Sequence, residues 1–285
     1  MNIMRFRPIF LILSLSMLII SAYSIIRWGF KKSIDFAGGS VWELEFSAPA
    51  QSSFFDKAFT DNKIEIKNMT FSDKLATLKF NNITQDQKLK LATDIKAITP
   101  DFKELRFETL GPSLGRELLI KTLYAIILSS IALFIFIGSR FKDPSFGLSA
   151  VLAMFHDTFI LIGSFSLLGH FVGAELDALF VTALLTTLSA SVHDTVVTFN
   201  RINELKIKNY QSDWVNLANR AVTETIVRSL NNSLTIIIML TSLVILGGSV
   251  TRWFALALLI GVVCGTYSST GVAIPLVLLA KRKKK

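Results

Sequence analysis

The segment ASVHDTVVTFNRINE, from Ala190 to Glu204, places an acidic residue inside an apolar helix. Five polar or charged residues recur around it at helical spacing and share one face of the helix: Thr187, Ser191, Asp194, Thr198 and Arg201. An acid inside a membrane is costly and usually marks an ion or substrate pathway. The alternative is that the hydroxyls bond the helix backbone and that Asp194 is a neutral packing residue. We expect Asp194 to be functional.

The composition indicates an integral membrane protein. The chain has 285 residues, of which 51% are hydrophobic, with a mean hydropathy of +0.52 and a formal net charge of +9. This profile excludes an ordinary soluble domain. Stretches long enough to cross a bilayer lie at residues 8–26, 118–138, 146–168, 176–199, 229–247 and 254–280. We therefore predict a multi-pass α-helical membrane protein with six transmembrane helices.

Lysine and arginine in the short connections predict the orientation, because these residues favour the cytoplasmic side. On one side of a six-span arrangement lie Arg5, Arg7, Arg140, Lys142, Arg201, Lys206, Lys208, Arg220 and the basic tail 281–285. On the other side, residues 169–175 carry none and residues 248–253 carry Arg252 alone. Both termini are thus predicted to be cytoplasmic, with the tail at the anionic inner leaflet. No aromatic or motif context favours nucleic acid as its partner.

The first apolar stretch also fits a cleaved signal peptide, since Arg5 and Arg7 precede an apolar core. Against this, the stretch is long, no A-x-A site follows, and Arg27, Lys31 and Lys32 come directly after it. We therefore divide the chain into a first helix (1–28), an external α+β domain (29–116), helices two to six (117–280) and a cytoplasmic tail (281–285).

The external segment alternates between strand and helix periodicity. Strand patterns occur at residues 42–46, 64–71, 75–80 and 105–109, and helical patterns at 54–59 and from Thr84 to a stop before Pro100. The order βαββαβ is that of a ferredoxin-like domain. The domain has no His, no Cys and no paired acids, and the lone Cys264 lies in the sixth span. We therefore expect neither an enzyme nor a metal or cofactor site.

Other spans carry polar residues. His156 and Asp157 are adjacent in the third span, and since neighbours on a helix point roughly 100° apart, we expect them to face different surroundings. Arg228 opens the fifth span and either reaches the interface or pairs with Asp194. In the sixth span Gly261 and Gly265 form a G-x-x-x-G for close helix packing, which we also assign to pairing with a homologous six-helix partner.

Several segments together resemble the SecF family within the SecD/SecF protein-export membrane proteins. They are IDFAGGSVWELEF (34–46), ETLGPSLGREL (108–118), the His156–Asp157 pair, Asp194 followed by Arg201 and Glu204, Arg228, and FALALLIGVVCGTYSS (254–269). Each motif alone is weak, but six in order are highly specific. The sequence departs from the family pattern at Ser189, Ala190, Ser191, His193, Asn200 and Asn203.

The resemblance implies a fold related to resistance-nodulation-division (RND) transporters, in the inner membrane, with proton flow coupled to motion of the periplasmic domain during preprotein export. The implied proton relay consists of Asp194 and Arg228, with a further acid from SecD. Auxiliary polar positions would be His156, Asp157, His193, Thr187, Ser191 and Thr198. The implied partners are SecD, the SecYEG translocon with YajC and YidC, preproteins, protons and membrane lipids.

Two other functions remain open from the residues alone. A small RND-type efflux transporter would need a roomy external domain, and one ferredoxin-like unit is too small for a substrate tunnel. An intramembrane hydrolase could use Asp157 and Asp194 as a catalytic dyad. No cleavage motif accompanies these acids, and Arg228 nearby would keep an acid ionised.

Overall fold

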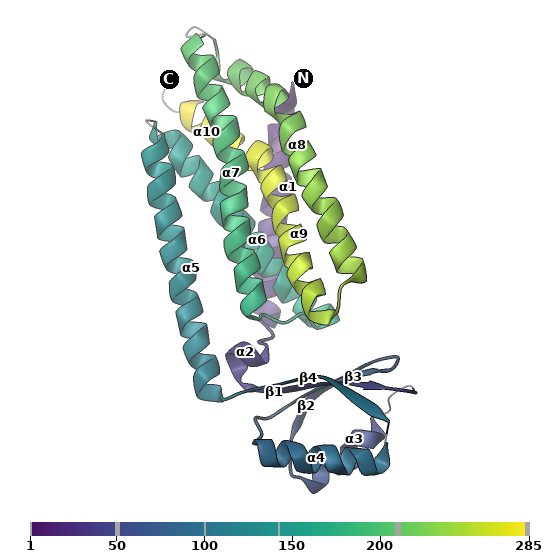
Figure 1. Cartoon of the computed structure of the whole chain (residues 1–285). Helices are drawn as coiled ribbons and strands as arrows, with labels where there is room; N and C mark the ends of the chain where they lie inside the picture. The colour runs from purple at the N-terminus through teal and green to yellow at the C-terminus, as the bar shows by residue number, and fades with distance from the viewer. Residues whose placement is uncertain (1, 49–51, 100, 142, 209–211, 283–285) are drawn as a thin grey trace. The chain divides into compact units, whose positions relative to one another are not determined.

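The computed structural model describes residues 2–48, 52–99, 101–141, 143–208 and 212–282 (Figure 1). The chain divides into two compact units. One comprises Met1–Lys31 together with Tyr124–Lys285, and the other is Lys32–Leu123. We call the first the membrane unit and the second the sheet unit, and we describe each by itself.

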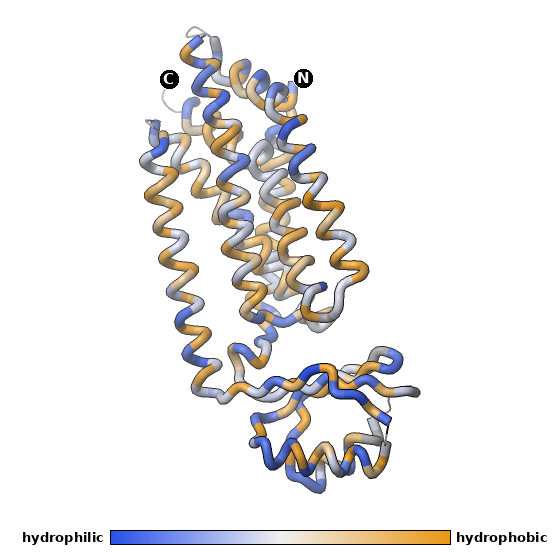
Figure 2. Tube along the Cα trace, viewed as in Figure 1, coloured by the Kyte–Doolittle hydropathy of each residue, from blue (hydrophilic) through white to orange (hydrophobic). Residues whose placement is uncertain are grey.

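Six helical spans are long and apolar enough to cross a membrane, as predicted. Figure 2 shows apolar residues along the length of these helices. The spans are α1 (Arg7–Trp28, preceded by the short η1, Ile3–Phe6), α5 (Pro112–Arg140), α6 (Pro144–Val172), α7 (Ala178–Lys208), α8 (Trp214–Leu246) and a sixth span of three segments. The helix α8 begins at Trp214, well before the predicted Ser229. Asp213 caps it by accepting a hydrogen bond from the Val215 amide.

The sixth span consists of α9 (Ser249–Ser268), a π-helical turn η2 (Ser269–Ala273) and α10 (Ile274–Arg282). Pro275 has no amide hydrogen, so the regular bond to the carbonyl four residues earlier cannot form there. A π turn just before a proline is one way for a helix to absorb that lost bond. The turn follows directly on Ser268, which takes part in the buried network described below.

Close helix contacts in the membrane unit depend on glycine. A Cβ on Gly261 would lie 2.0 Å from Thr187 Cγ2, and one on Gly163 of α6 would lie 2.2 Å from Ser21 Cβ of α1. A Cβ on Gly265 would lie 3.3 Å from Ser191 Cα. The G-x-x-x-G of α9 therefore packs against α7 of the same chain. Our assignment of these glycines to pairing with a partner was wrong, because both residues are buried inside this bundle.

The basic end of the sixth span is partly enclosed. Lys281 donates to the Asp143 carboxylate, and its ammonium lies 4.9 Å from the centre of the Trp214 ring. A cation over an aromatic face is stabilised electrostatically. Lys281 thus ties α10 to the beginnings of α6 and α8. Residues 283–285 of the tail lie outside the described part of the chain.

The sheet unit has the predicted βαββαβ order. Its elements are α2 (Ile34–Ala37), β1 (Gly39–Phe46), α3 (Ser53–Asp61), β2 (Ile66–Ser72), β3 (Leu75–Phe80), α4 (Gln85–Ile98) and β4 (Phe102–Leu110). The strand order is β2-β3-β1-β4 with every neighbouring pair antiparallel, which is the ferredoxin-like topology. Figure 1 shows α3 and α4 on one face of the sheet.

The alternating apolar residues of β1 form the core of the sheet unit. Trp42, Leu44 and Phe46 are at most 3% exposed and pack with Phe55 and Phe59 of α3. The side chain of Phe54, which we also expected here, lies outside the described residues. Thr84 caps α4 through a reciprocal capping box with Gln87. Hydrophobic alternation and a cap signal were thus sufficient to predict this unit.

Two motifs that carried the family resemblance lie against each other in the sheet unit. In the DFAGG stretch, Gly38 has φ +72° and Gly39 has φ +133°, backbone conformations that glycine adopts readily. A Cβ on Gly38 would lie 2.7 Å from Pro112 Cα, and a Cβ on Gly115 would lie 3.0 Å from the Gly38 nitrogen. The DFAGG and GPSLG motifs are therefore a matched pair that packs backbone on backbone.

Candidate functional site

Asp194 lies on α7 and is half-buried against α8. Its Oδ2 accepts a hydrogen bond from Ser229 Oγ of α8 at 2.9 Å. Its backbone carbonyl accepts from Thr198 Oγ1 at 3.2 Å. A hydroxyl donor stabilises the ionised carboxylate but less than a paired cation would. The acid is thus held in place while access to it remains open.

Asp194 and Arg228 line one cavity of about 280 Å³ between α7 and α8. The two residues that we expected to pair thus line the same cavity. Among the described residues, however, no ion pair joins them, and Arg228 is exposed. The lining residues are His193, Asp194, Val197, Thr198, Thr225, Arg228, Ser229 and Asn232. The neighbour of Arg228, Ser229, makes the bond to the carboxylate that we expected from the guanidinium.

A second cavity, of about 530 Å³, reaches Asp194 from the other direction along α7. His193, Asp194 and Asn232 line both cavities. The remaining residues of the second cavity include Ser191, Ser233, Gly261, Gly265 and Thr266. Asp194 therefore lies where two partly polar hollows meet, a position suited to a group that receives a proton on one side and releases it on the other.

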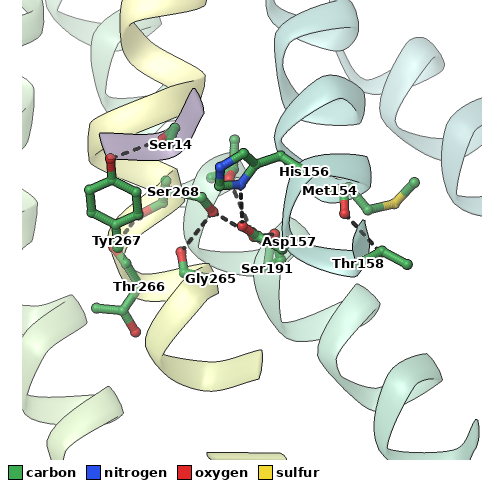
Figure 3. A network of polar contacts seen from close by, with 12 residues as sticks. Ser14, Met154, His156, Asp157, Thr158, Ser191, Gly265, Thr266, Tyr267 and Ser268 are labelled. Atoms are coloured by element: carbon green, nitrogen blue, oxygen red, sulfur yellow. Dashed lines mark hydrogen bonds and ion pairs between the residues drawn. The ribbon is translucent and has the colours of Figure 1, made fainter. Parts of the chain in front are cut away.

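A second acid, Asp157 of α6, is only 4% exposed. Its Oδ2 accepts from Ser191 Oγ of α7 at 2.6 Å and from Ser268 Oγ of α9 at 2.5 Å. Its Oδ1 lies 2.9 Å from His156 Nδ1. Figure 3 shows these side chains converging from three helices. We expected His156 and Asp157 to face different surroundings, but both are buried and their side chains bend toward each other to form a direct hydrogen bond.

The sequence did not connect Ser268 to Asp157. The signals available were the turn spacing from Gly265 and the serine run before Pro275, and neither indicates a carboxylate partner. Nearby, Tyr267 Oη donates to the Phe10 carbonyl at 2.5 Å and contacts Ser14 Oγ at 2.9 Å (Figure 3). These contacts join α1 to α9 beside the Asp157 network.

The remaining residues of the predicted polar stripe divide between two roles. Thr187 and Thr198 donate to the carbonyls of Leu184 and Asp194 in their own helix, as the packing interpretation expected. Ser191 instead donates across to Asp157. At the end of the stripe, Arg201 binds Glu204 and, in α8, Glu224, each at 2.6 Å.

The proposed catalytic dyad does not form. Asp157 is bonded to Ser191, Ser268 and His156, and Asp194 to Ser229, and within the described ranges no hydrogen bond joins the two acids. The described residues also contain no cluster of three or more His, Cys, Asp or Glu arranged to hold a metal ion.

The chain is similar in sequence to known proteins. The family described as "Protein export membrane protein SecD/SecF, C-terminal" matches residues 90–283. A protein translocase subunit SecF from Thermobaculum terrenum is 35% identical, over 94% of this chain and 90% of that protein. A second, from Sebaldella termitidis, is 33% identical over 100% of this chain and 93% of its own length.

The fold is also similar to that of a solved structure, the crystal structure of SecDF, a translocon-associated membrane protein from Thermus thermophilus. The TM-score is 0.87 at 28% identity, and the match covers 99% of this chain. This chain spans 39% of the length of that SecDF chain. The similarity in sequence along the whole chain and the shared fold lead to one conclusion: the chain belongs to the SecD/SecF family of protein-export membrane proteins.

Proposed function

We propose that this chain is a SecF-type auxiliary subunit of the Sec protein translocase, which uses the proton motive force to promote late steps of preprotein export. The observation that carries the proposal is the match, over 94% of the chain, to a protein named as a translocase subunit SecF. An accessory role of this kind needs no enzymatic site. The position of Asp194 between two cavities supports a proton-driven role.

The proposed partner in the membrane is SecD. The similar SecDF chain is more than twice as long as this one, since this chain corresponds to 39% of it. A separate SecD subunit would supply the remaining part. The SecYEG translocon, with YajC and YidC, and the preprotein itself would be contacted through that complex.

The proposed location is the cytoplasmic (inner) membrane, with both termini in the cytoplasm and the sheet unit in the periplasm. The distribution of lysine and arginine between the short connections supports this orientation. It would place the ferredoxin-like domain on the side toward which the preprotein moves.

In the proposed mechanism Asp194 carries the proton and Arg228 acts as a fixed charge. Arginine keeps its proton at physiological pH, so it can only bias the carboxylate electrostatically. When helix motion brings the guanidinium to Asp194, the ionised acid is stabilised, and when the two side chains separate, that stabilisation is lost. One proton crossing about 100 mV releases roughly 2.3 kcal/mol, enough to bias a two-state motion of the periplasmic domain.

Reconstitution of this chain with a SecD subunit tests the proposal. Membrane vesicles containing the SecYEG translocon should complete preprotein translocation faster when both subunits and a proton gradient are present. Vesicles with either subunit alone serve as the matched control. Equal rates with and without this chain would remove the basis for a SecF function.

A small efflux transporter of the RND type is the second candidate, and it is not favoured. The matched relatives are named as translocase subunits, and the similar solved chain is described as translocon-associated.

A further inference from the structure

We propose that the buried His156–Asp157 pair binds one exchangeable proton and is a second proton-binding site of the membrane unit, separate from Asp194. The pair lies in α6, and both side chains are at most 7% exposed. His156 Nδ1 and Asp157 Oδ1 are 2.9 Å apart. A histidine and a carboxylate in direct contact share their protons, so the pair titrates as one unit.

The hydrogen bonds of Asp157 fit an ionised carboxylate. Its Oδ2 accepts from the Ser191 and Ser268 hydroxyls, at 2.6 and 2.5 Å, and its Oδ1 lies against His156 Nδ1, which donates to it in the Nδ1–H tautomer. Bonds of this length between a hydroxyl and an oxygen are typical of a charged acceptor. Three donors make the proton-free pair, with its net charge of −1, attainable in the interior.

Charge favours the proton-loaded pair. Within 4.0 Å of Asp157, His156 is the single basic side chain among the described residues. A buried charge without a counter-ion is strongly disfavoured. One additional proton, either on the imidazole or on the carboxylate, makes the pair neutral. The hydrogen bonds to Asp157 therefore stabilise the state without the added proton, whereas burial away from water stabilises the state that holds it. Because the two effects oppose each other, proton binding is reversible.

The second imidazole nitrogen is free to accommodate either state. His156 Nε2 is buried and has no hydrogen-bond partner among the described residues. His156 also lines a groove of about 450 Å³ whose other residues are Leu18, Leu152, Phe155, Thr158, Phe159 and Ile162. The Thr158 hydroxyl donates to the Met154 carbonyl.

Among the described residues, no ion pair joins His156 or Asp157 to another charged side chain, and the titratable groups of α7 nearest to Ser191 are His193 and Asp194. From α9, Cys264 and Tyr267 face Asp157. From α7 the contact is the Ser191 hydroxyl, and from α1 it is Leu18. Among the described residues of η2 none is titratable. The ionisable residues of α1 are Arg7, Tyr23 and Arg27, and Tyr23 is 59% exposed. On α10, Lys281 is engaged by Asp143.

Ser191 connects the pair to the cavity of Asp194. Its hydroxyl bonds Asp157 Oδ2, and the residue also lines the 530 Å³ cavity that Asp194 lines. A hydroxyl both donates and accepts, so it can pass a proton between cavity water and the carboxylate. The inference that this proton follows the same transport route as the proton on Asp194 rests on the proposed function. The inference that the pair binds a proton is independent of that function.

Histidine nitrogen NMR tests the proposal directly. The chain has three histidines, so a His170→Gln, His193→Gln variant leaves His156 as the single imidazole. With ¹⁵N-histidine in the full chain in lipid vesicles, the nitrogen shifts separate three states. These are the Nδ1–H tautomer of the empty pair, the imidazolium, and the Nε2–H tautomer that results when Asp157 holds the proton.

We expect the Nδ1–H tautomer at alkaline pH and a loaded state at acidic pH, in reversible exchange. Asp194→Asn, the matched control, should leave this transition in place, and Asp157→Asn should abolish the imidazolium. One unchanging tautomer across the accessible pH range, in the chain with Asp157 intact, would show a purely structural pair. This result is independent of translocation, so a failed translocation assay and a failed titration are distinguishable.

Discussion

Ser229 of α8 donates a hydrogen bond to Asp194 of α7 over 2.9 Å, although the neighbouring Arg228 carries the charge that would bind a carboxylate more strongly. Both side chains line the same cavity. The Ser229 hydroxyl therefore forms the hydrogen bond to the Asp194 carboxylate, and the Arg228 guanidinium forms no ion pair with it. In the proposed mechanism, this arrangement corresponds to the state in which the guanidinium is separated from the acid and the serine hydroxyl is the weaker donor.

Ser229→Ala removes this donor. Leaving a half-buried acceptor without its hydrogen-bond partner costs about 1–3 kcal/mol of free energy. This cost destabilises the ionised form of Asp194. The protonated form is then favoured, so gradient-driven translocation should shift its pH profile to higher pH. Ser229→Thr keeps a hydroxyl and is the matched control. An unchanged pH profile for Ser229→Ala would mean that the serine does not influence the acid.

Gly261→Ala should destabilise the membrane unit by about 1–3 kcal/mol, because its Cβ would overlap Thr187 Cγ2 at 2.0 Å. Gly248→Ala is the matched control, since nothing lies within 4 Å of the added Cβ. Thermal unfolding of the purified chain in detergent measures the difference. Equal melting temperatures for the two variants would contradict the close packing of α9 on α7.

Gly38→Ala should destabilise the sheet unit. The residue has φ +72°, and the new Cβ would lie 2.7 Å from Pro112 Cα. Strain of this kind costs of order 1–3 kcal/mol. Denaturant unfolding, followed by the fluorescence of the buried Trp42 in a chain whose Trp28, Trp214 and Trp253 are replaced by Phe, measures the change. Gly111→Ala, whose Cβ would meet nothing closer than 3.8 Å, should behave like the native chain, and a similar loss in both variants would contradict the backbone packing.

Thiol labelling tests the orientation. Asp61→Cys in α3 should react with an impermeant thiol reagent added to intact cells, and Lys208→Cys at the end of α7 should be protected. Both native side chains are exposed, so accessibility alone does not separate the two positions. The native Cys264 is buried and gives little background. Reversed labelling would overturn the assignment of both termini to the cytoplasm.

Local patterns predicted much of the fold. Unbroken apolar runs revealed the six spans, and alternation at Trp42, Leu44 and Phe46 revealed the buried face of β1. The start of α8 was missed because Arg220, Glu224 and Arg228 interrupt its apolar pattern. In the structure, ion pairs of Glu224 with Arg201 and Arg220 satisfy two of these three charges.

The site could be predicted in part. A single acid inside an apolar helix identified Asp194 from sequence, since that position is costly in itself. The bonds from Ser191 and Ser268 to Asp157 could not be predicted, because they depend on how α6, α7 and α9 pack. The contact of His156 with Asp157 was missed because helical spacing fixes the Cβ directions but not the side-chain torsions.

The central claim, that Asp194 carries the driving proton, is tested most directly by the proton-gradient dependence of preprotein translocation in inverted membrane vesicles with this chain and SecD. Asp194→Asn keeps the shape and a hydrogen-bond acceptor for Ser229 but cannot ionise. It should leave assembly with SecD intact and abolish the gradient-dependent part of translocation, while Arg228→Lys should give an intermediate rate. If the proton gradient stimulates translocation by the Asp194→Asn variant as fully as it does with the native chain, the account is contradicted and Asp194 has a structural role.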